Sequence, residues 1–226
     1  MSTNSHPIYL LSIRGTLAPQ TIEAARSIHN QTAGAPAGVA TARSLGDLSH
    51  MVHIPVEHEG HPAGDFLILD LWNNLEGLNQ FFANPQVEQG GHMIFTQRAP
   101  VVWAPAEEFY SYHIPAPTGK NQRIVGIVRG KVSSRAAAAA AHNGFVSKMV
   151  NQARAAGNLS HECYFRLAAP GTPEALEFLG VDTWFDGQGM AQYYEKPELM
   201  QGLMEMFAEE PSATVWVHPG GEWVEW

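Results

Sequence analysis

The sequence predicts an α+β fold built from two similar units in tandem, and three observations support this prediction. The pentapeptide GDLSH at residues 46–50 returns as GNLSH at residues 157–161. Residues 69–95 align with residues 181–207 without a gap, and eight of the 27 aligned positions are identical, against roughly two by chance. Both halves also show the same succession of strand-like and helix-like apolar patterns, so an internal duplication explains the whole chain. The identical pairs are Asp70/Asp182, Trp72/Trp184, Gly77/Gly189, Gln80/Gln192, Pro85/Pro197, Gln89/Gln201, Gly90/Gly202 and Phe95/Phe207.

Each half opens with a segment that predicts a buried strand. Residues 8–15 (IYLLSIRG) and 123–130 (RIVGIVRG) are apolar, rich in β-branched residues and end at a glycine. This alignment places Arg14 opposite Arg129.

A helix is predicted next in each half. In the first half, Pro19 stands where a first-turn proline is favoured, and residues 21–32 continue the helix. In the second half, Ser133 or Ser134 can cap an alanine-rich run that ends at Gly157.

The repeated pentapeptide then leads into a second strand, at residues 48–56 and 159–167. A polar hairpin connects it to a third strand at residues 65–72 and 177–184. The third strand carries the repeated aspartate and tryptophan, Asp70 and Trp72 in the first half and Asp182 and Trp184 in the second.

A second helix and a last strand complete each half. The helix follows capping side chains and runs, with a proline break, to about Phe95 and Phe207. The last strand covers residues 100–104 and 214–218. The resulting order, β-α-β-β-α-β, is that of a ferredoxin-like unit, in which two helices cover one face of an antiparallel sheet.

The uncovered sheet face of such a unit is apolar and needs a partner. We therefore expect the two units to pack sheet to sheet as an intramolecular α/β barrel. The predicted domains are residues 1–105 and 123–226, joined by a linker at residues 106–122.

Composition narrows the classes of function. The 226 residues include 22 acidic and 13 basic ones, giving a net charge of −9, which disfavours nucleic acid and anionic membranes as partners. We find no signal peptide and no membrane-spanning apolar run, and the single cysteine, Cys163, suits a reducing compartment. We expect a cytoplasmic protein that binds a small molecule, with association into a homodimer left open. We expect Cys163 to be a small, buried apolar side chain on a strand, although His161 lies two positions away.

Two corresponding stretches carry a resemblance to a known family. Residues 69–86 (LDLWNNLEGLNQFFANPQ) and 181–198 (VDTWFDGQGMAQYYEKPE) each show a strand that ends in an aspartate and a tryptophan, then a helix that runs into a proline. This pattern resembles the dimeric α/β-barrel superfamily, of the antibiotic-biosynthesis-monooxygenase-like and EthD-like types, in a tandem single-chain form. The resemblance implies chemistry on a small molecule: oxygenation of phenolic or quinone-like compounds without a cofactor, haem degradation, isomerisation, decarboxylation, or no known reaction.

The same resemblance indicates which residues a haem site would need. Haem-degrading members pair a tryptophan in this segment with a histidine ten residues later. Here Phe82 follows Trp72 and Tyr194 follows Trp184 at that distance. The sequence therefore predicts no typical haem site and no cofactor.

Histidines are the candidate catalytic residues. His50 and His161 end the repeated pentapeptide, and each could act as a general base because the pKa of histidine lies near neutrality. The alternative is a side chain that bonds to the neighbouring backbone. His53 and His92 have no histidine counterpart in the second half, so we place the catalytic site in the first unit, with His50 assisted by one of them.

Arginines are the candidate anion-binding residues. Arg14 and Arg129 could hold a carboxylate or phenolate of a substrate. Alternatively, they pair with Asp70 and Asp182 on the neighbouring third strand, and we favour these salt bridges.

Two tryptophans are candidates for a substrate-binding wall. Trp72 and Trp184 could each line a pocket for an aromatic ligand. Packing between sheet and helix is the alternative, and the one we favour.

The histidine-rich stretch that begins at His50 could hold a metal ion. His50 and His53 point to opposite faces of a strand, since side chains alternate with period two. His58 and His61 could meet in the hairpin, with Asp65 nearby, but exposed loop histidines are the simpler interpretation, and no metal site is predicted.

The leading hypothesis is an enzyme acting on an aromatic, quinone or polyketide-like substrate through proton transfer by histidine, including monooxygenation without a cofactor. The alternatives are a non-catalytic module that binds a hydrophobic ligand or responds to stress, and an isomerase, lyase or oxygenase with a histidine-bound metal. No glycine-rich phosphate loop, paired CxxC motif or nucleophile elbow is present in the sequence.

Overall fold

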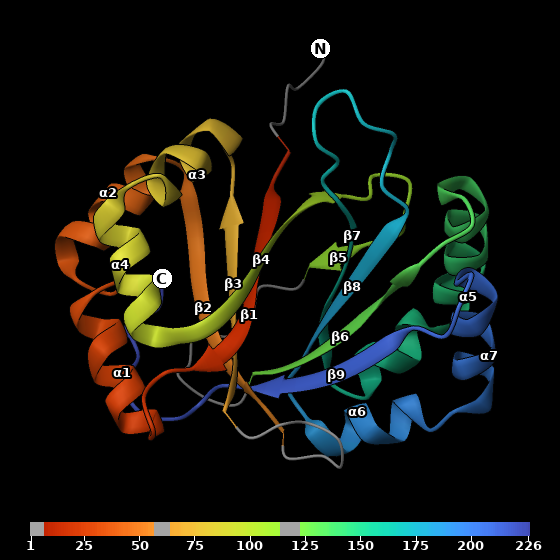
Figure 1. Cartoon of the computed structure of the whole chain (residues 1–226). Coiled ribbons are helices and arrows are strands. Elements are labelled where there is room, and N and C mark those ends of the chain that lie inside the picture. Colours follow the sequence, from red (N-terminus) through yellow and green to blue (C-terminus); the bar gives the residue numbers. More distant parts are fainter. Residues whose placement is uncertain (1–6, 57–63, 114–122) are drawn as a thin grey trace. The chain divides into compact units, whose positions relative to one another are not determined.

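The computed structural model describes residues 7–56, 64–113 and 123–226. The chain divides into two compact units (Figure 1). Unit 1 comprises Met1–Ala104 with Pro219–Trp226, and unit 2 comprises Pro105–His218. The described residues form nine strands and seven helices, so the predicted α+β class is confirmed.

Unit 1 is an antiparallel sheet with helices on one face (Figure 1). Its strands lie in the order β4-β1-β3-β2. Its elements are β1 (Tyr9–Leu17), α1 (Ile22–Gln31), α2 (Pro36–Ser44), β2 (Asp47–Pro55), β3 (Asp65–Trp72), α3 (Leu75–Phe82), α4 (Pro85–Ile94) and β4 (Phe95–Pro105).

Unit 2 has the same plan with one additional short strand. Its antiparallel strands lie in the order β9-β6-β8-β7-β5. Its elements are β5 (Tyr112–His113), β6 (Ile124–Lys131), α5 (Arg135–Ala155), β7 (Asn158–Arg166), β8 (Glu177–Trp184), α6 (Gly187–Tyr194), α7 (Pro197–Met206) and β9 (Ser212–Val217).

The glycine of the repeated pentapeptide has the same task in both units. Gly46 and Gly157 adopt φ angles of 104° and 96°, which side chains with a Cβ rarely adopt. Their carbonyls accept hydrogen bonds from the backbone of Asn73 and Phe185 at 3.0 and 2.9 Å. The glycine thus ends the preceding helix and ties the start of one strand to the end of its neighbour.

The first helical region differs between the units. In unit 1, α1 ends at Gln31 and a separate helix, α2, begins at Pro36. Proline cannot donate a backbone hydrogen bond to the preceding turn, so it starts a helix rather than continuing one. In unit 2, α5 runs without interruption for 21 residues, from its cap at Ser134. The sequence predicted the single helix of unit 2 but not the second helix of unit 1.

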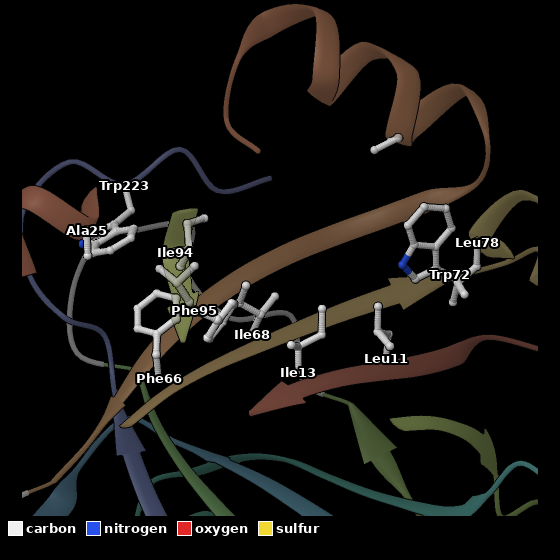
Figure 2. Packing of buried hydrophobic residues seen from close by; sticks show 12 residues of the cluster. Leu11, Ile13, Ala25, Phe66, Ile68, Trp72, Leu78, Ile94, Phe95 and Trp223 are labelled. Carbon is white, nitrogen blue, oxygen red and sulfur yellow. The ribbon is translucent and has the colours of Figure 1, made fainter. Parts of the chain in front are cut away.

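The core of unit 1 lies between the sheet and its helices (Figure 2). Figure 2 shows Trp72 and Leu78 toward one end of this layer and Phe66, Phe95 and Trp223 toward the other. Side chains from alternate positions of β1 and β3 point into it, as the period of a strand requires. Burial of each large aromatic side chain contributes on the order of 2–3 kcal/mol to stability.

The division into units differs from the predicted domains in two places. Residues 219–226 belong to unit 1, because Trp226 exchanges backbone hydrogen bonds with His50 at 2.8 and 3.3 Å and Trp223 lies in the core. Residues 106–113, predicted as part of the linker, belong to unit 2, because Ala106 bonds to the Cys163 carbonyl and β5 pairs with β7. The sheet-to-sheet packing of the units stays a prediction. Within the described ranges, no helix has both the length and the apolar character needed to cross a membrane.

Candidate functional site

A chain of three polar side chains is buried under the helices of unit 1. His50 on β2 lies directly opposite Asp70 on β3, so the two side chains share one sheet face. His50 Nδ1 lies 2.7 Å from Asp70 Oδ1. On its other side, His50 Nε2 lies 2.8 Å from Nε2 of His29, which α1 supplies.

Unit 2 contains the same chain. His161 on β7 lies opposite Asp182 on β8, with 2.6 Å between Nδ1 and Oδ1. His161 Nε2 lies 2.8 Å from Nε2 of His142 on α5. Both units thus position a helix histidine, a strand histidine and an aspartate in line.

Asn30 fixes the orientation of the His29 ring. Its Nδ2 donates to the Glu222 carbonyl at 2.8 Å, and its Oδ1 accepts from the Val224 amide at 2.9 Å. The oxygen is therefore also the atom 3.1 Å from His29 Nδ1, so that ring nitrogen carries the hydrogen. The lone pair of His29 then lies on Nε2, the nitrogen that faces His50.

Asn143 fixes the His142 ring in unit 2 in the same way. Its Nδ2 donates to the Glu108 carbonyl at 2.9 Å, and its Oδ1 accepts from the Tyr110 amide at 2.7 Å. Asn143 Oδ1 lies 3.0 Å from His142 Nδ1, which donates to it. The lone pair on His142 Nε2 therefore faces His161.

The two facing nitrogens of unit 1 need a proton between them. His50 Nδ1 donates to Asp70, so without a further proton both Nε2 atoms would be acceptors 2.8 Å apart. Burial, followed by the charge of His50, lowers the pKa of His29 from 6.5 to about 4. Burial also acts to lower the pKa of His50, but Asp70, with Asp47 and Glu225, outweighs it and the pKa is raised above 6.5. The proton therefore resides on His50, as an imidazolium between His29 and Asp70.

Aromatic rings cover both histidines of unit 1. Trp226 stacks on His50 with ring centroids 4.6 Å apart, and Trp223 lies edge-on to His29 at 5.1 Å. The segment that carries these rings is the one that orients Asn30.

A corresponding segment, which runs into β5, precedes β6 in unit 2. Tyr112 lies 5.8 Å from His161 and Phe109 lies 5.0 Å from His142, measured between ring centroids. The two aromatic residues have the same spacing of three in EEFYSY (107–112) and GEWVEW (221–226). These segments, which we call the closing segments, are a further part of the duplication.

Unit 1 has a cavity of about 520 Å³ beside its polar chain. Asp47, His50 and Asp70 contribute buried polar groups to its lining. The remaining lining is mainly apolar or small and includes Ile13, Thr32, Ala33, Ala35, Gly38, Ile68, Phe81, Phe82, Ile94, Phe95 and Trp226. Further polar side chains of the lining are Gln31, Thr41, Asn84, Gln86, Gln89 and Arg98. The corresponding cavity of unit 2 measures about 50 Å³, enough for a water molecule but not for an organic ligand.

A tyrosine completes the polar chain of unit 2. Tyr194 donates its hydroxyl hydrogen to Asp182 Oδ2 at 2.5 Å. Burial and the Asp182 charge raise the pKa of Tyr194 well above 10. In unit 1 the same position is Phe82, which lines the cavity instead.

The one position at which the two pentapeptides differ also lines the cavities, as Asp47 in unit 1 and Asn158 in unit 2. Burial, followed by the charge of Asp70, raises the pKa of Asp47 to about 8. Asn158 occupies this position in unit 2, and its Oδ1 accepts a hydrogen bond from the Tyr112 hydroxyl at 2.6 Å. A neutral amide in unit 2 thus takes the place of a carboxyl group whose pKa is raised in unit 1.

The predicted assistants of His50 lie elsewhere. His92 is exposed on α4, with Nε2 3.8 Å from Glu88 Oε1, and does not line the cavity. His53 is buried on the sheet face opposite to His50, because the two residues are three apart on β2. The partner that the structure gives to His50 is His29. His58 and His61 lie outside the described residues.

The predicted salt bridges to Asp70 and Asp182 are wrong. Arg14 pairs with Asp65 at 2.5 Å, and Arg129 pairs with Glu177 at 2.6 Å. The reason is strand parity: Asp70 points to the helix side of the sheet with His50, whereas Arg14 and Asp65 lie on the other side. Neither arginine lines a cavity of its unit.

The two tryptophans pack in the cores. Trp72 is fully buried behind Phe81 and Phe82, with ring centroids 5.7 and 6.3 Å away, and does not line the cavity. Trp184 packs on Tyr193 and Tyr194 and also lines the small cavity of unit 2. The apolar wall predicted for Trp72 is instead supplied by the phenylalanines in front of it.

Sequence reasoning missed His29, His142 and the closing segments. The signal was available, since His-Asn occurs at 29–30 and again at 142–143, inside the first predicted helix of each half. The closing segments were harder to recognise, because one follows unit 1 in the sequence but belongs to unit 2.

Comparison with known proteins establishes a fold. No protein-family profile and no curated protein matches the sequence. Among solved structures, a "putative monooxygenase" from Lactobacillus acidophilus NCFM has a TM-score of 0.61 at 11% identity, with 94% of this chain and 96% of that chain covered. An anthrone oxidase-like protein has a TM-score of 0.60 at 15% identity, with 96% and 93% covered. A mutant chlorite dismutase from Candidatus Nitrospira defluvii has a TM-score of 0.58 at 10% identity, with 96% and 93% covered.

These structures correct one prediction. Chlorite dismutases, which share the fold, are haem proteins, so the fold does not support the sequence-based prediction of no cofactor and no typical haem site. His50 is not placed as an axial haem ligand. In the described part of the chain, the histidine that lines this cavity is His50, and its two ring nitrogens already face Asp70 and His29. What the chain shares with the monooxygenase-like proteins is their fold.

Proposed function

We propose that the protein is an enzyme that binds a phenol or enol in the cavity of unit 1 and removes its hydroxyl proton. The observation that carries this proposal is the Tyr194–Asp182 hydrogen bond of unit 2. It shows where a phenol hydroxyl meets the aspartate of this polar chain. Because Tyr194 stays protonated there, a substrate that gives up its proton must have a hydroxyl more acidic than that of tyrosine. In unit 1 the tyrosine is replaced by Phe82, and a cavity lies beside the corresponding Asp70.

The cavity has the size and lining for such a ligand. Its volume of about 520 Å³ lies within the range typical of small-molecule sites, roughly 300–1,000 Å³. Phe81, Phe82 and Ile68 offer apolar surface for a flat ring system, and Asp47, His50 and Asp70 offer polar groups for a hydroxyl. A ligand with a hydroxyl on an aromatic body suits this lining.

The charges of the site balance during proton transfer. Before the transfer, Asp70 is negative, His50 is positive and the ligand is neutral. The ligand's O–H bond breaks, its proton moves to Asp70 Oδ2, and the electron pair stays on the ligand oxygen. The resulting phenolate faces the His50 imidazolium, so the total charge is unchanged in a poorly solvated site.

Deprotonation is the step that oxygenation of phenols and isomerisation of enols share. The fold that the chain shares with monooxygenase-like and anthrone oxidase-like proteins favours oxygenation of an aromatic hydroxy compound among these. A ligand-binding module without chemistry is the second candidate, and it predicts a neutral bound phenol.

Titration of the full chain with 1-naphthol tests the proposal. We expect the bound ligand to show the absorption of naphtholate at a pH where free naphthol is neutral. Asp70→Asn should abolish this signal and weaken binding about 10- to 100-fold, equivalent to about 1.4–2.7 kcal/mol. Oxygen consumption with anthrone and naphthols then measures turnover.

Asp182→Asn is the matched control, since it removes the equivalent carboxylate of unit 2. We expect it to leave naphtholate formation unchanged, while thermal unfolding reports the structural cost of both variants. Equal loss in the two variants, or a bound ligand that stays neutral in the unmodified protein, would contradict the proposal.

A further inference from the structure

We propose that unit 2 holds a metal site formed by His142 Nε2, His161 Nε2 and Cys163 Sγ, for a borderline or soft transition-metal ion such as zinc or copper. The three atoms come from α5 and β7, and they lie within 4.8 Å of one another. This site is separate from the cavity proposed for the substrate in unit 1.

The distances suit a tetrahedral ion. Cys163 Sγ lies 3.5 Å from His142 Nε2 and 3.4 Å from His161 Nε2, and the two nitrogens are 2.8 Å apart. Bonds of about 2.0–2.1 Å to nitrogen and about 2.3 Å to sulfur separate tetrahedral ligand atoms by roughly 3.3–3.6 Å. The sulfur–nitrogen distances match, and the histidines need to separate by about half an ångström.

The lone pairs already face the common centre. Asn143 receives the Nδ1 hydrogen of His142, and Asp182 receives that of His161, so both Nε2 atoms face the common centre. As in unit 1, the 2.8 Å between these nitrogens requires a shared proton, which the incoming metal ion would displace. A hydrogen-bonded carboxylate or amide behind a metal-bound histidine is the usual arrangement in metal sites. Both outer partners are themselves held, Asn143 by backbone groups and Asp182 by Tyr194.

The identity of the third ligand separates the two units. Val52 on β2 occupies the position of Cys163, two residues after the strand histidine in each case. Unit 1 therefore has two facing nitrogens and no third ligand atom at this position, and a proton satisfies them. Unit 2 adds a soft sulfur, which favours zinc or copper over magnesium and calcium.

The site leaves room for one exchangeable ligand. His142 and Cys163 are buried, and His161 is largely so. The 50 Å³ cavity of unit 2 is lined by both histidines and can hold a water molecule in a fourth position. An ion held by three protein ligands and one water is the pattern of an open rather than a purely structural site.

Metal loading of the purified full chain tests the proposal. After equilibration with Co²⁺ and gel filtration, we expect one equivalent of cobalt per chain and an absorption spectrum with a thiolate-to-cobalt charge-transfer band. Loading with Zn²⁺ should protect Cys163 from alkylation by iodoacetamide. Cys163→Val, which installs the residue of unit 1, should weaken binding more than about 100-fold and remove the charge-transfer band.

Val52→Cys provides a gain-of-function control, because it adds a thiol to the His29–His50 pair of unit 1. We expect it to raise the stoichiometry to two equivalents. Unchanged cobalt binding in Cys163→Val, the absence of a thiolate band, or alkylation that zinc does not slow would each overturn the proposal. Naphthol binding in Cys163→Val should equal that of the unmodified chain, which separates this test from the test of the proposed function.

Discussion

The two units share a buried chain of histidine, histidine and aspartate, yet they surround it differently. Unit 1 leaves a cavity of about 520 Å³ beside the chain, and unit 2 leaves about 50 Å³. The polar groups are therefore the constant part of the duplicated scaffold. Whether a unit can bind a ligand beside these polar groups depends on the side chains that fill the neighbouring space or leave it open.

The broken helix of unit 1 is the main cause of this difference. Between α1 and α2, the chain passes through small residues such as Thr32, Ala33 and Ala35, which line the cavity. In unit 2 the unbroken α5 directs Phe145 and Val146 into the corresponding space.

Two equivalent glycines, Gly90 on α4 and Gly202 on α7, show the same difference between the units in what packs against them. A Cβ on Gly202 would come within 2.6 Å of the Phe145 ring, whereas a Cβ on Gly90 would meet Thr32 at 3.3 Å. In unit 2 the Phe145 ring packs against the backbone of Gly202, and unit 1 has Thr32 in place of the phenylalanine. One aromatic ring thus accounts for much of the closed space.

The largest effect is expected from closing the cavity of unit 1. Thr32→Phe installs the ring that fills unit 2, so naphthol binding should weaken by more than about 100-fold, or about 2.7 kcal/mol. Isothermal titration measures the loss, and Phe145→Thr in unit 2 is the control that should leave binding unchanged. Naphthol binding of normal affinity by a folded Thr32→Phe variant would mean that the ligand occupies another place.

A different effect, on stability rather than on binding, is expected from Asp47→Asn, which installs the residue of unit 2. The folded-state pKa of Asp47, about 8, lies above the value of 3.8 for a free side chain, so the folded state binds its proton more tightly. This contribution to stability is complete below pH 4 and is lost as the pH rises from about 4 to 8. The asparagine removes that loss, so the variant should be more stable at pH 8, on the order of a few kcal/mol.

Urea unfolding at pH 5 and at pH 8 measures this difference. The stability of the variant should change less between the two pH values than that of the unmodified chain. Asn158→Asp in unit 2 should have the opposite effect, because it buries a carboxyl group that the Tyr112 hydroxyl alone would bond. Parallel pH dependence of Asp47→Asn and the unmodified chain would show that Asp47 ionises normally.

The smallest effect is expected from Phe82→Tyr. The new hydroxyl would donate a hydrogen bond to Asp70, as Tyr194 does to Asp182 in unit 2, and the substrate would have to displace it. We expect naphthol affinity to fall about 10-fold, or about 1.4 kcal/mol, and the naphtholate signal to fall with it. Tyr194→Phe should leave both unchanged. Stronger binding by Phe82→Tyr would contradict the placement of the ligand hydroxyl at Asp70.

Much of the fold was predictable because duplication reveals strand and helix order twice. The repeated glycine and the proline-started helices fixed the boundaries in both copies. His50 and Asp70 were both recognised, but their direct pairing was not, because it depends on which residues of β2 and β3 lie opposite each other. The same register explains the wrong partners assigned to Arg14 and Arg129.

The remaining site residues come from parts of the chain that no local pattern connects. His29 reaches His50 from a helix, and the Asn30 contact that orients it spans 192 residues of sequence. Hydrophobic periodicity predicts that α1 packs on the sheet but not which polar residue meets which. Trp226 resembles an isolated surface tryptophan in the sequence until its pairing with His50 is known.

The closing segments also impose an order on biosynthesis. Residues 105–113 emerge from the ribosome before the rest of unit 2, so that unit can complete its polar chain as soon as α5, β7 and β8 have been made. Unit 1 is translated first but needs Trp223 and Trp226, which are added after all of unit 2. The half of the protein that begins folding earliest is therefore the last to acquire a finished binding site.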